Sequence, residues 1–301
     1  MNQLAIVIPF YKIDFFEETL KSIASQTNQN FTLYIGNDAS ANDPLPTIQK
    51  YLKKDRYHYY NYTTNLGGEN LALQWERILE NVKEEWFQIL GDDDMISANF
   101  VEEFYKNLPL VEKENITVLK FTHEWVDEKG NKLQYFNYKQ DYLDAVNFIM
   151  KKYHNTVKSS LSENIFLTKM WQKIGFQKMP LAWGSDDLAI LQFSNYKKIK
   201  YSTNARVSVR ISTSSISGSS LFDDEKNKAI QLFREKIILE CSSYFPRPFL
   251  DQIIGDYLEK GYIQKFKIRY AIAFIVLKYK GLFSFLKTLR KIKYINSQST
   301  P

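Results

Sequence analysis

Three consecutive carboxylates, Asp92–Asp94, follow the apolar segment "WFQIL" in the first half of the chain. Like charges this close repel one another, and burying them is costly unless a counter-charge is supplied. A solvated turn, with one Asp capping the next helix, is one explanation. The other is a divalent cation held by carboxylate oxygens at the end of a buried strand. Three acidic residues alone do not decide between the two.

Two further polar clusters also come directly after apolar segments. Tyr11 and Lys12 follow "LAIVIPF", and Asn37 and Asp38 close "FTLYIGND". Ligands of a parallel sheet covered by helices bind outside the carboxyl ends of its strands. We therefore expect the three clusters to lie together at one edge of such a sheet, as a binding site.

The elements that would position these clusters alternate along the first hundred residues. The apolar segments are typical of strands covered on both faces. Between them lie three segments with helical spacing of apolar residues, at 15–26, 44–54 and 69–82. This alternation predicts an α/β fold with a mostly parallel central sheet flanked by helices.

The rest of the chain is less regular up to about residue 220. "KIKYS" and "ARVSVRIS" predict two strands, "WGSDDLAILQFSN" a helix, and "STSSISGSS" a flexible polar loop. From Leu221 onward the pattern is helical.

Composition and missing motifs exclude several classes of protein. The chain of 301 residues has one cysteine and three scattered histidines, so it has no internal disulfide and no zinc cluster. A dinucleotide fingerprint, a phosphate-binding P-loop and a nucleophile elbow are all absent. No secretion signal and no apolar segment of eighteen residues occurs, so we expect a cytoplasmic protein.

Four short motifs, "AIVIPFYK", "YIGNDASAND", "NLGGEN" and "FQILGDDD", occur in this order. Together they resemble the nucleotide-binding half of inverting family 2 glycosyltransferases with the GT-A fold, of the kind that build bacterial surface glycans. The resemblance covers residues 3–100 well and 160–215 in outline. It implies a GT-A domain over 1–220, with a nucleotide-binding half at 1–100 and an acceptor half at 101–220. A helical basic region at 221–301 lies outside it.

The resemblance implies a nucleotide-sugar donor, most simply a UDP-sugar. Pro9, Phe10 and Tyr11 would lie near the nucleobase, and Asp38 would accept hydrogen bonds from the base or ribose. The implied nucleotide-sugar-binding set is Pro9, Phe10, Tyr11, Asp38, Asn65, Gly67, Gly68, Asp92 and Arg210.

The Asp triplet corresponds to the family's Asp-x-Asp signature, with Gly91 where its first Asp often stands. Asp93 and Asp94 are the best-matched metal ligands, and Asp92 would supply the shifted partner. Negative charge grows on the diphosphate as the sugar leaves, and Mn²⁺ or Mg²⁺ offsets it. Together with the other three motifs, the triplet is therefore interpreted as a metal site and not as a solvated turn.

The segment "LAWGSDDLAIL" resembles the acidic pair that supplies the family's catalytic base. One of the two, with Asp187 preferred to Asp186, would take the proton from the attacking acceptor hydroxyl. Such a transfer typically raises the rate a hundred- to ten-thousand-fold. Two carboxylates that complement the dipole of the helix are the alternative. Trp183 would either stack on a sugar or belong to the core.

The family usually has an Arg after the glycine loop, where this chain has Ala72. Arg77 is one candidate replacement. Arg210, in a loop resembling the one that closes over the diphosphate, is the other, and a charged contact with phosphate would be strong. Its serines 212, 214, 215 and 217 suit a mobile lid. An exposed polar loop is the alternative.

After Glu259 the chain has ten Lys and Arg residues and no acidic residue. The net charge of +6 therefore divides into +10 for this tail and −4 for the rest. Aromatic and aliphatic residues alternate with the cations, as in helices that lie in a membrane interface. "AIAFIVL" is too apolar for a nucleic-acid surface. The tail predicts peripheral association with the inner face of the cell membrane, which suits a lipid-linked acceptor, with a basic helical pair as the alternative.

We therefore predict a metal-dependent inverting glycosyltransferase that adds a sugar to lipopolysaccharide, capsule or another surface glycan. A nucleotidyltransferase acting on sugar phosphates is the first alternative. A non-catalytic, membrane-associated protein on a degenerate transferase fold is the second. Sequence does not identify the sugar, the acceptor or the oligomeric state.

Overall fold

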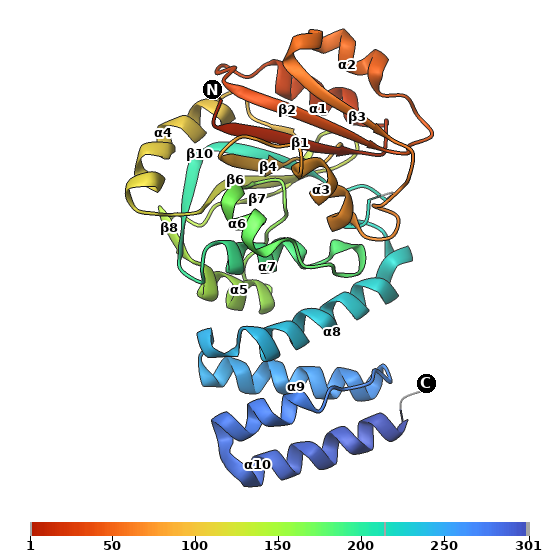
Figure 1. Ribbon diagram of the computed structural model, residues 1–301, viewed down its shortest axis with the longest axis vertical. Coiled ribbons are helices and arrows are strands. Elements are labelled where there is room, and N and C mark those ends of the chain that lie inside the picture. Colours follow the sequence, from red (N-terminus) through yellow and green to blue (C-terminus); the bar gives the residue numbers. More distant parts are fainter. Residues whose placement is uncertain (1, 214, 299–301) are drawn as a thin grey trace. The chain divides into compact units, whose positions relative to one another are not determined.

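The computed structural model describes residues 2–213 and 215–298, and it divides the chain into two compact units, Met1–Phe222 and Asp223–Pro301 (Figure 1). Ser214, one of the serines expected in the lid, lies outside the described residues. The first unit carries all the residues expected in the site.

A single curled sheet forms the centre of the first unit. Its described strands are β1 (Leu4–Phe10), β2 (Phe31–Asp38), β3 (Tyr57–Tyr62), β4 (Trp86–Ile89), β5 (Met95–Ile96), β6 (Val118–Val126), β7 (Lys132–Phe136), β8 (Tyr142–Asp144), β9 (Asn164–Leu167) and β10 (Lys198–Arg210). They follow the order β3-β2-β1-β4-β9-β6-β10-β5, with β7 beside β6 and β8 beside β10. Strands β1–β4 are parallel, and β9 runs antiparallel between β4 and β6. The prediction of an α/β fold with a mostly parallel sheet is confirmed.

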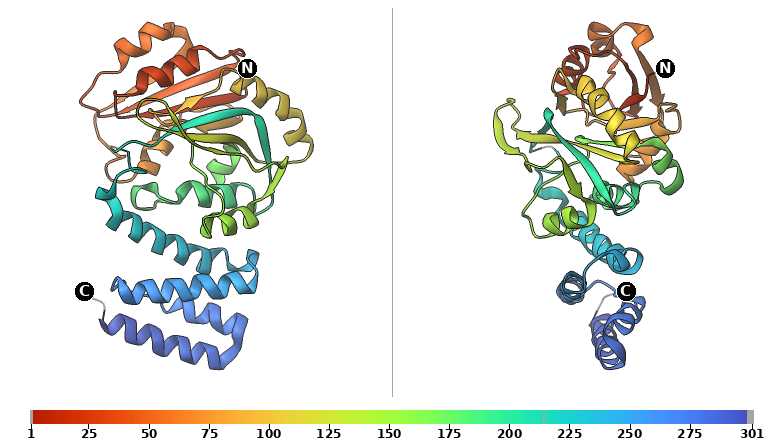
Figure 2. Two further views of the ribbon diagram at one scale, coloured as in Figure 1. Left: turned by 180° about the vertical axis from the view of Figure 1, so that it is seen from behind. Right: turned by 90° about the vertical axis from the view of Figure 1, so that its left-hand side faces the viewer.

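Helices cover both faces of the sheet (Figure 2). The helices of this unit are α1 (Phe16–Ala24), α2 (Leu45–Tyr51), α3 (Leu71–Leu79), α4 (Phe100–Lys113), α5 (Ala145–Tyr153), α6 (Thr168–Ile174) and α7 (Ser185–Phe193), with short 3-10 turns at Lys54–Arg56, Pro180–Ala182 and Ser220–Phe222. One apolar cluster joins β1 and β2 to α1, α2 and α4. On the other face, aromatic side chains of β4 and β9 pack against α6 and α7, and Phe176 joins them to Trp75 of α3.

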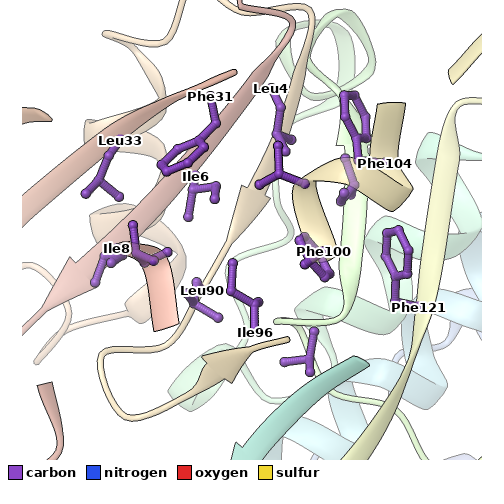
Figure 3. Packing of buried hydrophobic residues seen from close by; sticks show 14 of the residues in the cluster. Leu4, Ile6, Ile8, Phe31, Leu33, Leu90, Ile96, Phe100, Phe104 and Phe121 are labelled. Atoms are coloured by element: carbon purple, nitrogen blue, oxygen red, sulfur yellow. The ribbon is translucent and has the colours of Figure 1, made fainter. Parts of the chain in front are cut away.

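Alternate residues of the buried strands explain this layering. Leu4, Ile6 and Ile8 of β1 point to the same side, where Phe100 and Phe104 of α4 close the core (Figure 3). All five side chains are fully buried. A strand buried on both faces needs apolar residues at nearly every position, as β1 has.

The structure has one strand where the sequence predicted two. β10 runs continuously from Lys198 to Arg210, and its pairing with β6 shifts register between Ser202 and Arg206. Extra residues on one strand form a bulge that bends it. The polar residues at the bulge therefore resemble a turn in the sequence, and β10 continues to the edge where the Asp triplet lies.

The second unit is helical over its described residues, with α8 (Asp223–Glu240), a 3-10 turn (Ser242–Tyr244), α9 (Arg247–Ile263) and α10 (Ala271–Gln298). Gly281 breaks α10, with a φ of 79° that side-chain-bearing residues rarely adopt. The two arms contact each other through Phe274 and Phe285, and Asn296 of the second arm bonds both backbone groups of Ile268, just before α10. Among the described helices, none combines the length and apolarity that crossing a membrane requires.

Candidate active site

Asp92 connects the ends of β1 and β4. Its Oδ2 accepts hydrogen bonds from the backbone N–H groups of Tyr11 and Lys12, both at 2.7 Å. Burial and the neighbouring Asp93 raise the pKa of Asp92 to about 7, although the two amides oppose the shift. Oδ2 of Asp92 already accepts two hydrogen bonds, one for each lone pair. The predicted nucleotide or metal contact of Asp92 would therefore have to come from Oδ1.

Asp94 is the most buried carboxylate of the triplet. Its Oδ1 accepts a hydrogen bond from the backbone N–H of Arg210 at 2.9 Å, and its Oδ2 accepts one from the Ser162 hydroxyl at 2.5 Å. Burial raises the pKa of Asp94 well above its usual value, and the charge of Asp93 adds to this shift. Burial also raises the pKa of Asp93. Neutral partners thus hold the triplet in place, while its charges repel each other.

Gly91 explains how the carboxylates fit together. A Cβ at this position would lie 2.9 Å from Asp94 Oδ2 and 3.1 Å from Asp93 Oδ1. The two oxygens therefore converge on the space above the glycine, which an aspartate would fill. This accounts for glycine at the position where the Asp-x-Asp signature would have its first Asp.

Asp93 and Asp94 are the two carboxylates whose arrangement fits a divalent cation. Within the described ranges, no three His, Cys, Asp or Glu side chains form a group that could hold a metal by themselves. Mg²⁺ typically takes one or two carboxylates and completes its shell with waters and substrate phosphates. Converging oxygens of Asp93 and Asp94 with raised pKa values match that requirement, because a cation would relieve their repulsion.

Arg210 is buried, unlike the exposed or lid-borne arginine that the sequence suggested. Its side chain is fully buried and donates to the backbone oxygens of Asp93, Asp127 and Glu128 and to the carboxylate of Glu18. The guanidinium also lies 4.1 Å from the centre of the Phe15 ring. Arg210 thus joins four segments around the triplet. Its phosphate contact stays a prediction and would require some of these bonds to be exchanged.

Asp38 organises the loop that follows β3. Its two carboxylate oxygens accept the N–H groups of Leu66 and Gly67, at 2.9 and 2.7 Å. The Arg77 guanidinium lies 2.6 Å from Asp38 Oδ1 and 3.6 Å from the centre of the Tyr62 ring. Arg77 is therefore paired within the loop and Ala72 carries no charge, so neither position offers an unpaired cation to a diphosphate.

The loop and the end of β1 place the remaining predicted nucleotide-binding residues. A Cβ on Gly67 would lie 2.5 Å from Asp38 Oδ2, so the close approach needs glycine. Asn65 accepts a hydrogen bond from the N–H of Gly68 at 2.6 Å. Pro9 pairs with β2, Phe10 is buried in the core, and Tyr11 is 46% exposed. Tyr11 is thus the aromatic ring of this set that a base could reach.

The acidic pair lies in the first turn of α7, after a strained loop. Leu181 and Ala182 have φ values of 56° and 51°, and Gly184 has 86°. Such strain concentrates at functional sites. Asp187 Oδ1 lies 2.5 Å from the Lys152 ammonium, and Asp186 Oδ2 lies 3.8 Å from it. Burial raises the pKa of Asp187 to about 7 even though Lys152 lowers it.

A buried network connects the acidic pair to the triplet. Lys120 and Glu163 are both fully buried, with 2.6 Å between Nζ and Oε1. Lys120 also donates to the Ser159 hydroxyl at 2.7 Å, and Lys152 donates to the Ser159 carbonyl at 3.1 Å. Burial would raise the pKa of Glu163, but His123 and Lys120 lower it to about 2. Ser162, which bonds Asp94, belongs to the same segment.

Sequence reasoning did not identify Ser162, Lys152, Lys120 or Glu163. They lie outside the recognisable motifs and meet the site through contacts between distant parts of the chain. A further link, from Asn70 to the Met179 carbonyl at 2.7 Å, joins the glycine loop to the loop before α7. Trp183, in that loop, is half-buried. The structure therefore brings the glycine loop, the triplet and the acidic pair to the carboxyl edge of the sheet.

A family model and several relatives match this chain. The model for glycosyl transferase family 2 matches residues 5–161, slightly more than half of the chain. A Rickettsia conorii protein described as an uncharacterized glycosyltransferase is 29% identical over 133 residues, which are 44% of this chain and 21% of that protein. This chain thus matches about a fifth of that relative's length. A Rickettsia typhi protein with the same description is 21% identical over 89% of this chain and 84% of its own length.

Solved structures share the fold. Residues 1–349 of Staphylococcus aureus TarS, solved in complexes with UDP and with UDP-GlcNAc, superpose with a TM-score of 0.62. The match covers 98% of this chain and 90% of the TarS chain at 15% sequence identity. At that identity the similarity concerns the arrangement of the backbone.

Proposed function

The chain belongs to glycosyl transferase family 2 and has the GT-A fold, and we propose that it transfers a sugar, with inversion, from a UDP-sugar to an acceptor hydroxyl. The observation that carries the proposal is the convergence of Asp93 and Asp94 above Gly91 at the carboxyl end of β4. A cation and the diphosphate of the donor would bind there. The TarS complexes support uracil as the base of the donor.

Asp93 and Asp94 would hold Mn²⁺ or Mg²⁺, with Asp92 contributing through Oδ1. The cation supplies positive charge to the leaving diphosphate when it is bound. The protein keeps the two carboxylates in place through Ser162 and the backbone of Arg210. Because these donors are neutral, the charge of the carboxylates is left for the cation to offset when it replaces their protons.

Asp187 would act as the general base, with Asp186 as its neighbour. Inversion requires the acceptor hydroxyl to attack the anomeric carbon from the side opposite the leaving group, so its proton must go to a group on that side. A base works best when its pKa lies near the working pH. The pKa of about 7 for Asp187, set by burial against the opposing effect of Lys152, satisfies this condition.

The remaining assignments concern the nucleotide. Tyr11 would contact the base, with Pro9 and Phe10 behind it. Asp38, Asn65, Gly67 and Gly68 would shape the loop along the nucleoside, and Arg210 would reach the diphosphate after a change in its bonds. Residues 1–100 would thus form the nucleotide-binding half and 101–220 the acceptor half. The acceptor would be a glycan or lipid-linked saccharide of a bacterial surface polymer, modified at the cytoplasmic face of the membrane.

A ligand screen tests the donor and the cation together. Purified chain is heated with UDP, other nucleoside diphosphates and nucleotide sugars, each with and without Mn²⁺. A ligand at 100 times its dissociation constant adds about 2.7 kcal/mol of stability. We expect UDP and one UDP-sugar to stabilise the chain only with Mn²⁺. Product analysis with that donor should find UDP, whereas pyrophosphate would indicate a nucleotidyltransferase.

Two variants separate the roles, with the exposed Asp55→Asn as a matched control. Asp93→Asn should abolish the Mn²⁺-dependent stabilisation by UDP. Asp187→Asn should keep that stabilisation and lower kcat a hundred- to ten-thousand-fold. Asp55→Asn should behave as wild type in both measurements. A folded Asp187→Asn variant with wild-type transfer would refute the base and leave the donor assignment standing.

A further inference from the structure

The bend of α10 exposes large apolar side chains among cations. Leu282, Phe283 and Leu286 follow the break at Gly281 and are 63%, 83% and 44% exposed. At 3.6 residues per turn, these three positions lie within about 100° of the helix surface. Phe274, from the other arm of α10, is 59% exposed and contacts Phe285. We call Phe274, Leu282, Phe283 and Leu286 the bend cluster.

Most of the charge around the bend cluster is positive. α10 contains six Lys and Arg residues and no acidic residue. Lys278 and Lys280 precede Gly281, and Lys287, Arg290 and Lys291 follow Leu286. These five side chains are exposed. Long basic side chains beside an exposed apolar patch are typical of helices that lie in the interface of an anionic bilayer.

A groove between α9 and α10 extends the same surface. It has a volume of about 300 Å³, and its lining includes Leu250, Ile254, Val276 and Phe283. Arg247, Lys280 and Lys287 also line it, and Asp251 pairs with Lys280 at 2.6 Å. The groove thus offers apolar walls next to Phe283 and one further cation, Arg247.

We infer that the bend cluster and the cations around it attach this unit to an anionic lipid surface. The apolar side chains would enter the region below the headgroups, while the flanking Lys and Arg contact phosphates. A second copy of the chain fits this surface poorly, because like charges would meet across the interface. The inference does not depend on sugar transfer.

Vesicle sedimentation with the full chain tests the inference. Vesicles of phosphatidylcholine with one quarter phosphatidylglycerol should sediment the wild-type chain at low salt, and pure phosphatidylcholine should sediment much less. Binding should weaken with added salt, because screening reduces the attraction. A wild-type chain that remains in the supernatant with both vesicle types would overturn the inference.

Two variants with matched controls locate the surface. Leu282→Ser with Phe283→Ser should lower partitioning tenfold or more, while Leu133→Ser with Tyr135→Ser, exposed on β7, should leave it unchanged. Lys287→Gln, Arg290→Gln and Lys291→Gln together should lower it about a hundredfold, at about fivefold per cation. The control with the same charge change is Lys53→Gln, Lys54→Gln and Lys129→Gln.

The outcomes are distinguishable. Equal loss in test and control variants would show a general charge effect and overturn the site. Sedimentation velocity showing a dimer that only the bend variant disrupts, with vesicle binding unchanged, would assign the surface to a second copy. Tight binding of a DNA duplex without vesicle binding would assign it to nucleic acid. If the serine variant does not fold, the cation variant still decides.

Discussion

Burial raises the pKa values of the three carboxylates of the Asp92–Asp94 triplet and of Asp187 in the acidic pair, but the two groups have different neighbours. For Asp94, the second-largest influence on the pKa after burial is another carboxylate, which raises it further. For Asp187, the second-largest influence is Lys152, which lowers it. The chain thus supplies a cation to the pair and mainly neutral donors to the triplet.

This difference suggests where outside charge is needed. A carboxylate beside a lysine can stay ionised without a ligand, and it can accept a proton in each turnover. Carboxylates that repel each other are stable together only when a cation or a proton joins them. The pair is therefore suited to proton transfer and the triplet to a metal.

The largest expected effect concerns the network behind the pair. Lys120→Met leaves Glu163 buried without its ion-pair partner at 2.6 Å. Removing one member of a buried pair typically costs about 3–5 kcal/mol. Urea denaturation should show this loss as a lower midpoint with an unchanged slope. The double variant Lys120→Met with Glu163→Leu should recover much of it, and a loss below about 1 kcal/mol in the single variant would contradict the network's role.

The next effect acts on the pair itself. Lys152→Met removes the charge that lowers the pKa of Asp187, so that pKa should rise above about 7. The base is active when ionised, so the acidic limb of the kcat/KM profile should move to higher pH, by about one unit. At pH values below both pKa values, kcat/KM of the variant should be about tenfold lower than that of the wild type. The exposed neighbour Lys151→Met is the control, and identical profiles for the two variants would show that Lys152 does not set the pKa.

The comparison also shows what the sequence could predict. The triplet was predictable because a short buried strand delivers it, and the strands before it have the same pattern. The acidic pair was predictable from its place at the start of α7. Both predictions depend on local order along the chain, and their roles stay predictions.

The network was not predictable, because its contacts join distant segments. Lys120 and Glu163 are 43 positions apart, and Lys152 and Asp187 are 35 apart. A lysine in a strand and a lysine in a helix both resemble surface residues in a sequence. Arg210 was recognised in the sequence as a candidate, but its burial was not predictable. It follows from four segments that meet only in the folded chain.

The smallest effect measures the triplet without enzyme assays. The pKa of Asp92 is raised to about 7 from 3.8, so between these values the folded chain keeps a proton that the unfolded chain has lost. The free energy of unfolding should therefore fall by at least about 1 kcal/mol as the pH rises from 5 to 8. Mn²⁺ with UDP should stabilise the chain more at pH 8 than at pH 5, since protons compete with the metal. Asp92→Asn keeps an oxygen for the two amides and should flatten the fall. If neither Mn²⁺ nor Asp92→Asn changes the pH dependence, then Asp92 is not the group that titrates. Asp187, whose pKa is also raised to about 7, would be the remaining candidate.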